Sequence, residues 1–279
     1  MAIAEIIWDT AAEQALGGVP LLVRGLVRHK VEERARRHGK GTVTLADFHE
    51  AEARFRAVMG GKSADELARM LPRENAPGSE MVLIEACHGT LSNCPNLLID
   101  TTAWQRAVED WVRESEVSER LRRRVTGDRI LFHHKLRIAI AGCPNGCSRP
   151  QIAEVGLVGY VRPAVSPAEC TRCGACAAAC PDTAIAVNGA PPVFDPATCQ
   201  GCLRCRAACP VGCITLSPPG VRVLLGGKLG RHPHLAEVVD EQTDPAAIIA
   251  LLDRVVGDYI ANALPEERFA DYRLRARER

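Results

Sequence analysis

Cysteine is the residue type in this sequence whose number and spacing point most directly to chemistry. The chain of 279 residues contains 13 cysteines. Most of them stand in short C-x2-C or C-x3-C spacings, whereas disulfides usually close longer loops. Short spacings of this kind place thiolates around a metal ion or a metal cluster. We therefore expect these thiols to bind metal.

Eight of the cysteines form an internal repeat of two matched runs. The first run is Cys170-Thr-Arg-Cys173-Gly-Ala-Cys176-Ala-Ala-Ala-Cys180-Pro, and the second is Cys199-Gln-Gly-Cys202-Leu-Arg-Cys205-Arg-Ala-Ala-Cys209-Pro. Both have the C-x2-C-x2-C-x3-C-P spacing of bacterial two-cluster ferredoxins, in which the fourth cysteine of each run binds the other cluster. Zinc is the alternative for a single CxxC pair, but the triple run followed by Cys-Pro suits it poorly.

The ferredoxin spacing predicts two 4Fe-4S clusters with crossed ligands. The first cluster is assigned to Cys170, Cys173, Cys176 and Cys209. The second is assigned to Cys199, Cys202, Cys205 and Cys180. Cys213 is left outside both sets, and its default interpretation is a small buried hydrophobe.

Two further pairs of thiols stand in turns outside the repeat. Cys143-Pro-Asn-Gly-Cys147 lies between two apolar, strand-like segments, 136–141 and 152–159. Cys87 and Cys94 bracket a turn that follows a short apolar strand, 81–86. Because a tight turn after a strand holds its side chains at one edge of a sheet, both pairs have the geometry of a metal site.

The Gly-Cys-Pro-Asn-Gly-Cys turn closely resembles the cluster motif of the sirohaem-dependent sulfite and nitrite reductases. The Gly-rich basic loop from Gly226 to His232 and the stretch Glu267-Arg268-Phe269 resemble two further segments of that family. The resemblance implies a third 4Fe-4S cluster, in which Cys147 bridges the cluster to the sirohaem iron. Its ligands would be Cys87, Cys94, Cys143 and Cys147.

The resemblance also implies an activity, which is the multi-electron reduction of a small oxyanion, sulfite to sulfide or nitrite to ammonia. Basic residues near the two motifs are candidates to bind the oxyanion or a sirohaem carboxylate by charge-assisted hydrogen bonds. Candidate catalytic residues are Lys135, Arg137 and Arg149, and candidate cofactor-binding residues are Lys228 and Arg231. Taken singly, each is equally well explained as a surface charge.

The first 71 residues form a different, helical region. Apolar residues at helical spacing predict one helix between Pro20 and Gly39 and a second from about Leu45 to Met59, and Ser63 to Glu66 is a capping-box pattern for a third. The region resembles the small C-terminal domain of the B subunit of light-independent protochlorophyllide reductase. That resemblance implies tetrapyrrole contacts and makes Arg24 and Arg28 cofactor-binding candidates, although a solvated basic helix face is the favoured alternative.

The motifs together predict an α+β fold with a ferredoxin-type insertion. We expect a helical domain over 1–71, a reductase-like domain formed by 79–162 and 219–279, and the insertion over 163–218. A second helix pattern from Thr102 toward Arg124 belongs to the reductase-like domain.

The bulk composition excludes several classes of function. Lys plus Arg number 35 against 34 Asp plus Glu, so the chain has no overall charge that favours nucleic acid or an anionic membrane. No apolar run reaches the roughly 20 residues that a membrane span needs, and no signal peptide is recognisable. We therefore expect a cytoplasmic protein.

Two departures from the reductase pattern leave three hypotheses open. The Cys87 to Cys94 turn is one residue longer than usual, and only one of the family's two pseudo-symmetric halves is present. The chain is then a reductase completed by its N-terminal domain, a second copy or a partner subunit. Alternatively, it is a haem-free three-cluster protein that transfers electrons to a partner reductase, or a scaffold that carries sirohaem without turnover.

Overall fold

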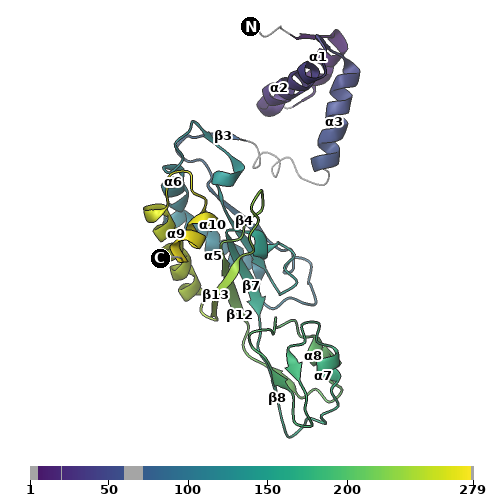
Figure 1. Cartoon of the computed structure of the whole chain (residues 1–279), viewed down its shortest axis with the longest axis vertical. Helices are drawn as coiled ribbons and strands as arrows, with labels where there is room; N and C mark the ends of the chain where they lie inside the picture. Colours follow the sequence, from purple (N-terminus) through teal and green to yellow (C-terminus); the bar gives the residue numbers. More distant parts are fainter. Residues whose placement is uncertain (1–5, 20, 60–71, 278–279) are drawn as a thin grey trace. The chain divides into compact units, whose positions relative to one another are not determined.

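The structure is a computed structural model that describes residues 6–19, 21–59 and 72–277. The chain divides into two compact units, Met1–Leu71 and Pro72–Arg279 (Figure 1). Within the described ranges, no helix has both the length and the apolar character required to cross a membrane.

The first unit is a small helical domain. Its helices are α1 (Thr10–Gly17), α2 (Leu21–Arg37) and α3 (Leu45–Met59), and its short parallel strands are β1 (Ile7–Trp8) and β2 (Thr42–Val43). The helix expected at 45–59 is present with those bounds, whereas the third helix expected from Ser63 lies outside the described residues. The core is formed by small and branched side chains: Ala12, Val31, Ala35 and Val43.

A five-stranded sheet organises the second unit. Three neighbouring strands are parallel: β4 (Val82–Ala86), β6 (Leu136–Ala141) and β7 (Val155–Tyr160). The antiparallel strands β12 (Gly220–Leu225) and β13 (Glu237–Gln242) follow in the order β13-β12-β7-β6-β4. A separate antiparallel pair is formed by β3 (Arg73–Glu74) and β5 (Arg129–Ile130).

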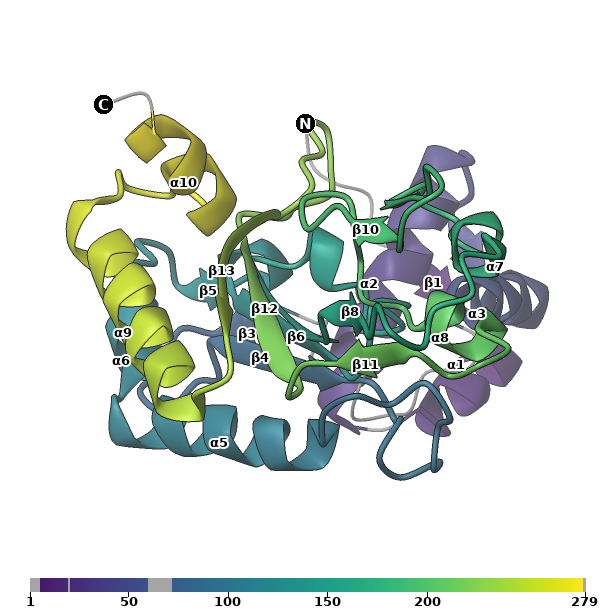
Figure 2. The same ribbon diagram turned by 90° about the horizontal axis from the view of Figure 1, so that it is seen from below.

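Four helices accompany this sheet: α5 (Thr101–Glu114), α6 (Val117–Arg122), α9 (Pro245–Asn262) and α10 (Phe269–Arg277). Figure 2 shows α5, α6 and α9 along the same side of the sheet. Alternate strand residues such as Leu136, Ile138 and Ile140 join the helices in one core, as the period of two in a strand requires. The mixture of sheet and separate helices confirms the α+β fold class.

The prediction of one helix from Thr102 toward Arg124 is wrong in two respects, the start of the helix and its continuity. Asp100 is the N-cap, because its carboxylate accepts hydrogen bonds from the backbone N–H groups of Thr102 and Ala103. The helix ends at Glu114, and Glu116 adopts a left-handed conformation (φ 51°) before α6 begins. A left-handed residue interrupts helical hydrogen bonding, which the apolar periodicity does not reveal.

The segment 163–218 is inserted between β7 and β12 and contains only short elements. Figure 1 shows it continuing from the end of the sheet at β7 and β12. Its elements are β8 (Pro163–Val165), α7 (Ala175–Ala178), β9 (Ile185–Ala186), β10 (Val193–Phe194), α8 (Arg204–Ala208) and β11 (Ile214–Leu216). Strand β8 pairs with β11, and β9 pairs with β10. We call this segment the insertion.

Candidate metal centres

The parallel strands bring the Cys87 and Cys143 loops to the same edge of the sheet. Cys87 follows the last residue of β4, and the Cys143 turn follows β6, its parallel neighbour. The backbone N–H of Cys87 donates to the carbonyl of Ile140 (2.8 Å), and the N–H of Gly142 donates to Cys87 Sγ (3.2 Å). Cys87, Cys94, Cys143 and Cys147, here called the sheet-edge thiols, therefore come from two directly connected loops.

Two glycines allow this close approach of the loops. A Cβ on Gly142 would lie 2.4 Å from Leu97 Cδ1, and a Cβ on Gly159 would lie 2.5 Å from the carbonyl oxygen of Gly142. The contact at Gly159 is with backbone, so this position depends on the absence of a side chain, whereas the contact at Gly142 is with the end of the Leu97 side chain, which can shift.

Two threonines, which the sequence reasoning missed, fix the Cys87 to Cys94 loop. The hydroxyl of the buried Thr101 donates to the carbonyl of Cys87 (2.9 Å). The backbone N–H of Thr101 donates to the hydroxyl of Thr90 (2.9 Å), which ties the loop to the start of α5. The available signal was Asp100, an N-cap residue placed shortly after the second thiol of the loop.

The electrostatics of the sheet-edge thiols favour a bound cation. Burial raises the pKa of the Cys143 thiol, and the neighbouring thiols of Cys94, Cys147 and Cys87 raise it further. Cys147 is exposed, and its sulfur accepts a hydrogen bond from the side-chain amide of Asn145 (3.1 Å). Several thiolates at one place repel one another, so positive metal charge is needed to hold them deprotonated together.

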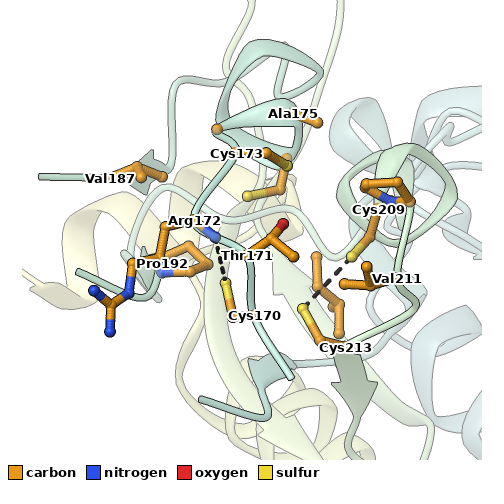
Figure 3. Close-up of a pocket in the computed structure, with 14 residues that line it drawn as sticks. Cys170, Thr171, Arg172, Cys173, Ala175, Val187, Pro192, Cys209, Val211 and Cys213 are labelled. Atoms are coloured by element: carbon orange, nitrogen blue, oxygen red, sulfur yellow. Dashed lines mark hydrogen bonds between the residues drawn. The ribbon is translucent and has the colours of Figure 1, made fainter. Parts of the chain in front are cut away.

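The insertion contains two sulfur-lined cavities. The first cavity is lined by the thiols of the first predicted ligand set and by Cys213 (Figure 3): Cys170, Cys173, Cys176, Cys209 and Cys213. The second cavity is lined by the thiols of the second predicted set: Cys180, Cys199, Cys202 and Cys205. The crossed grouping expected from the spacing is therefore also the grouping around the two cavities.

The donor atoms that line these cavities include the sulfurs of the predicted ligands. Burial raises the pKa of the Cys205 thiol to about 11, so this group stays protonated near neutrality unless metal binds. The four thiols of each predicted set match the four-cysteine ligation of a 4Fe-4S cluster.

The second cavity is the one that adjoins the sheet. A Cβ on Gly201 would lie 2.5 Å from the carbonyl oxygen of Val161, directly after β7. Arg222 of β12 is buried and donates to the carbonyl of Cys199 (3.3 Å) and to the Glu241 carboxylate (2.9 Å). These contacts fix the Cys199 loop against the end of β7 and β12.

The structure places Lys135 and Arg137 away from the sheet-edge thiols. Both residues stand at the amino end of β6, roughly 20–26 Å along the chain from Cys143 at about 3.3 Å per residue. Lys135 is buried, with its Nζ 3.9 Å from the Glu80 carboxylate. The Arg137 guanidinium lies 3.4 Å from the buried carboxylate of Glu154. Their catalytic assignment stays a prediction without support from proximity.

Arg149 does lie beside the Cys147 turn. It adopts a left-handed conformation (φ 58°), which is unfavourable for a residue with a Cβ, and its side chain is 69% exposed. Its nearest acidic partner is Glu85, at 3.7 Å. The guanidinium is therefore exposed to solvent, on a residue two positions after the exposed Cys147.

The two basic candidates of the Gly-rich loop differ in their environment. Lys228 is buried and pairs with Asp271 of α10. Arg231 is exposed and has no ion-pair partner among the described residues. Gln151 connects this loop to the Cys143 turn, because a Cβ on Gly227 would lie 2.7 Å from its carbonyl oxygen and its side chain lies against Gly146.

Arg24 and Arg28 make contacts within the first unit. Arg24 donates to the carbonyls of Gly17 (2.6 Å), the last residue of α1, and Val19 (2.9 Å). Arg28 pairs with Glu13, and its guanidinium lies 5.0 Å from the ring centroid of Trp8. These contacts account for both side chains structurally, and their cofactor-binding role stays a prediction.

Comparison with known proteins relates each unit to a family. Residues 78–275 match the model of the nitrite and sulphite reductase 4Fe-4S domain, and residues 8–52 match that of the proto-chlorophyllide reductase 57 kD subunit. The coenzyme F420-dependent sulfite reductase of Methanocaldococcus jannaschii is 36% identical over 178 residues, which are 63% of this chain and 26% of that protein.

Two further proteins are similar over parts of the chain. An anaerobic sulfite reductase subunit of Salmonella typhimurium is 30% identical over 102 residues, 37% of this chain and 25% of that protein. A crystal structure of dissimilatory sulfite reductase I aligns with 84% of this chain and 56% of its own at 13% identity and a TM-score of 0.48. The chain spans about a quarter of the length of the two sulfite reductase sequences. With most of its length matched by the first model, the chain belongs to the nitrite and sulphite reductase 4Fe-4S domain family.

Proposed function

We propose that this chain is an iron-sulfur oxidoreductase that reduces sulfite or nitrite at a sirohaem, with electrons relayed through its insertion. The proposal rests on the arrangement of three strand ends. Strands β4, β6 and β7 are adjacent and parallel, and their carboxyl ends lead into the Cys87 loop, the Cys143 turn and the insertion, respectively. Because neighbouring strands are about 4.8 Å apart, all proposed clusters gather at one edge of the sheet.

The contacts at the junction support an order for the relay. The second cavity adjoins the sheet through Gly201 and Arg222, and each cavity has one exposed thiol, Cys173 in the first and Cys202 in the second. Electrons from a donor protein then reach the first cluster, pass to the second and continue to the cluster of the sheet-edge thiols. The ligands in this proposal are the twelve cysteines assigned from the sequence.

The residues around the Cys143 turn suit a sirohaem beside the third cluster. When bound, sirohaem supplies a single iron at which the oxyanion is reduced. Cys147, the exposed thiol of the four, would hold that iron as a shared thiolate. Arg149 and Arg231 are the basic candidates that present exposed guanidinium groups, and they would bind the oxyanion or a sirohaem carboxylate.

In the proposed function, this chain forms only part of the haem pocket. The chain matches about a quarter of each sulfite reductase relative, so a second copy or a partner subunit would complete the pocket. The same partial coverage, together with the exposure of Cys147, supports a second candidate function. In that alternative the chain is a haem-free three-cluster protein that passes electrons to a partner reductase.

Absorption spectroscopy of anaerobically purified protein separates the two functions. The reductase predicts Soret and near-red bands, an extractable tetrapyrrole, and sulfite or nitrite reduction driven by a reduced viologen. Cys147→Ser should alter the haem bands, whereas Cys173→Ser should leave them unchanged. Protein with all its clusters but no tetrapyrrole would overturn the reductase and support the electron carrier.

A further inference from the structure

Cys213 is the cysteine that the three predicted ligand sets leave over, and it lines the first cavity. Its side chain is buried, with 3% of its surface exposed, and its Sγ lies 3.5 Å from Sγ of Cys209. Figure 3 shows both sulfur atoms directed toward the space that Cys170 and Cys173 also face. The separation is far longer than the ~2.05 Å of a disulfide, so the contact is a hydrogen bond between sulfur atoms.

The internal repeat provides a matched position in the other half of the insertion. Cys209-Pro-Val-Gly-Cys213-Ile corresponds to Cys180-Pro-Asp-Thr-Ala184-Ile. Ala184 is buried to the same degree as Cys213, at 3% exposed, and its backbone N–H donates to Cys180 Sγ (3.3 Å). The two halves therefore differ at this position by one thiol group next to a predicted cluster ligand.

The direction of the sulfur–sulfur hydrogen bond follows from the role of Cys209. A cysteine that binds iron is a thiolate and has no proton to donate. Cys213 is then the S–H donor, with Cys209 as its acceptor at 3.5 Å and Cys170, a ligand of the same predicted cluster, as its other sulfur neighbour. Hydrogen bonds to cluster sulfur stabilise the reduced cluster, which carries one more negative charge, and therefore raise its reduction potential.

We propose that Cys213 raises the reduction potential of the first cluster by donating a hydrogen bond to Cys209. The cluster gains one electron on reduction, the proton stays on Cys213, and no bond to iron forms or breaks. The inference rests on the two-cluster assignment of the proposed function. A hydrogen bond of ordinary strength would change the equilibrium ratio of reduced to oxidised first cluster roughly fivefold. This corresponds to a shift of its reduction potential by about 40 mV, at 59 mV per tenfold.

A redox titration of the full chain, followed by electron paramagnetic resonance, tests this role. Cys213→Ala should lower one of the two ferredoxin-type potentials by about 40 mV, because it reproduces the Ala184 environment. Cys213→Ser keeps a donor and should restore most of the difference. Ala184→Cys, the reciprocal variant, should raise the other potential.

Three results would overturn the proposal. The first is an unchanged potential in Cys213→Ala protein that retains its iron, and the second is an unchanged potential in Ala184→Cys. The third is loss of iron in Cys213→Ala but not in the other variants, which would make Cys213 a ligand of the cluster. If Cys213→Ala fails to fold, the Ala184→Cys variant decides the question. Wild-type protein that lacks the ferredoxin-type clusters would instead contradict the proposed function, and its iron content distinguishes that failure.

Discussion

The sheet-edge thiols and the thiols of the insertion are held in place by different means. Behind the sheet-edge thiols lies the large apolar core between the sheet and its helices, which includes Ile138, Leu157 and Leu252. The insertion has helices of four and five residues. Its own core consists largely of the thiols themselves: Cys176, Cys205, Cys213 and Ile214. Apolar packing thus positions one site in advance, whereas the other depends on the metal that it binds.

Removal of iron is the strongest way to break this comparison. In protein freed of iron under anaerobic conditions, we expect the amides of 163–218 to exchange at nearly unfolded rates, because short elements cannot hold a core of thiols. Strands β6 and β7 should stay protected. Hydrogen exchange followed by mass spectrometry measures both segments in one sample, and a protected insertion in the iron-free protein would refute the distinction.

Gly159→Ala should damage the sheet-edge site and spare the insertion. The new Cβ would meet the Gly142 carbonyl at 2.5 Å, and overpacking of this kind costs about 1–3 kcal/mol. We expect a lower free energy of unfolding and loss of about four irons of one 4Fe-4S cluster. Gly127→Ala is the control, since its nearest neighbour would lie at 3.9 Å. Equal iron content in both variants would argue against a close approach of Gly159 to the Gly142 carbonyl in the folded protein.

Thr101→Val tests the tie between α5 and the Cys87 loop. The change leaves the carbonyl of Cys87 without its side-chain donor, at a cost of about 1–2 kcal/mol. Denaturant unfolding measures this loss, and Thr102→Val, one position along the same helix, is the matched control. Identical midpoints for the two variants would show that Thr101 does not stabilise the loop.

Acid should lower the free energy of unfolding of the second unit by a small amount, through an ion pair in α6. A hydrogen bond from Arg122 lowers the pKa of the Glu119 carboxyl to about 2 from 4.5. This contribution to stability is therefore present above about pH 4.5 and is lost as the pH falls toward 2. Glu119→Gln should flatten that part of the stability curve of iron-free protein, while Glu114→Gln at the exposed end of α5 should not. Curves that coincide for the wild type and Glu119→Gln would disprove this coupling.

The sequence predicted what depends on local pattern. The α+β class, the strand before each thiol turn and the crossed grouping of the eight insertion thiols all follow from spacing along the chain. The break at Glu116 was missed, because a left-handed residue leaves no trace in apolar periodicity. Gly142 and Gly159 were also missed as positioning residues, since only the folded sheet brings them together.

The basic residues show the limit of arguments from proximity in sequence. Lys135 and Arg137 precede the Cys143 turn by one strand length, which places them at the opposite end of the sheet. Lys228 has an acidic partner from α10, far away in sequence. Partners of charged side chains are set by tertiary packing, so the candidates differ in ways that composition and spacing do not reveal.

Iron analysis with Mössbauer spectroscopy on anaerobically purified protein tests the central claim most directly. The account predicts about 12 non-haem irons per chain in three 4Fe-4S clusters. It further predicts about eight in a Cys143→Ser variant, whose insertion clusters remain. Full-length, folded wild-type protein that holds only the iron of two clusters would contradict the account, because the sheet-edge thiols would then not form a cluster site.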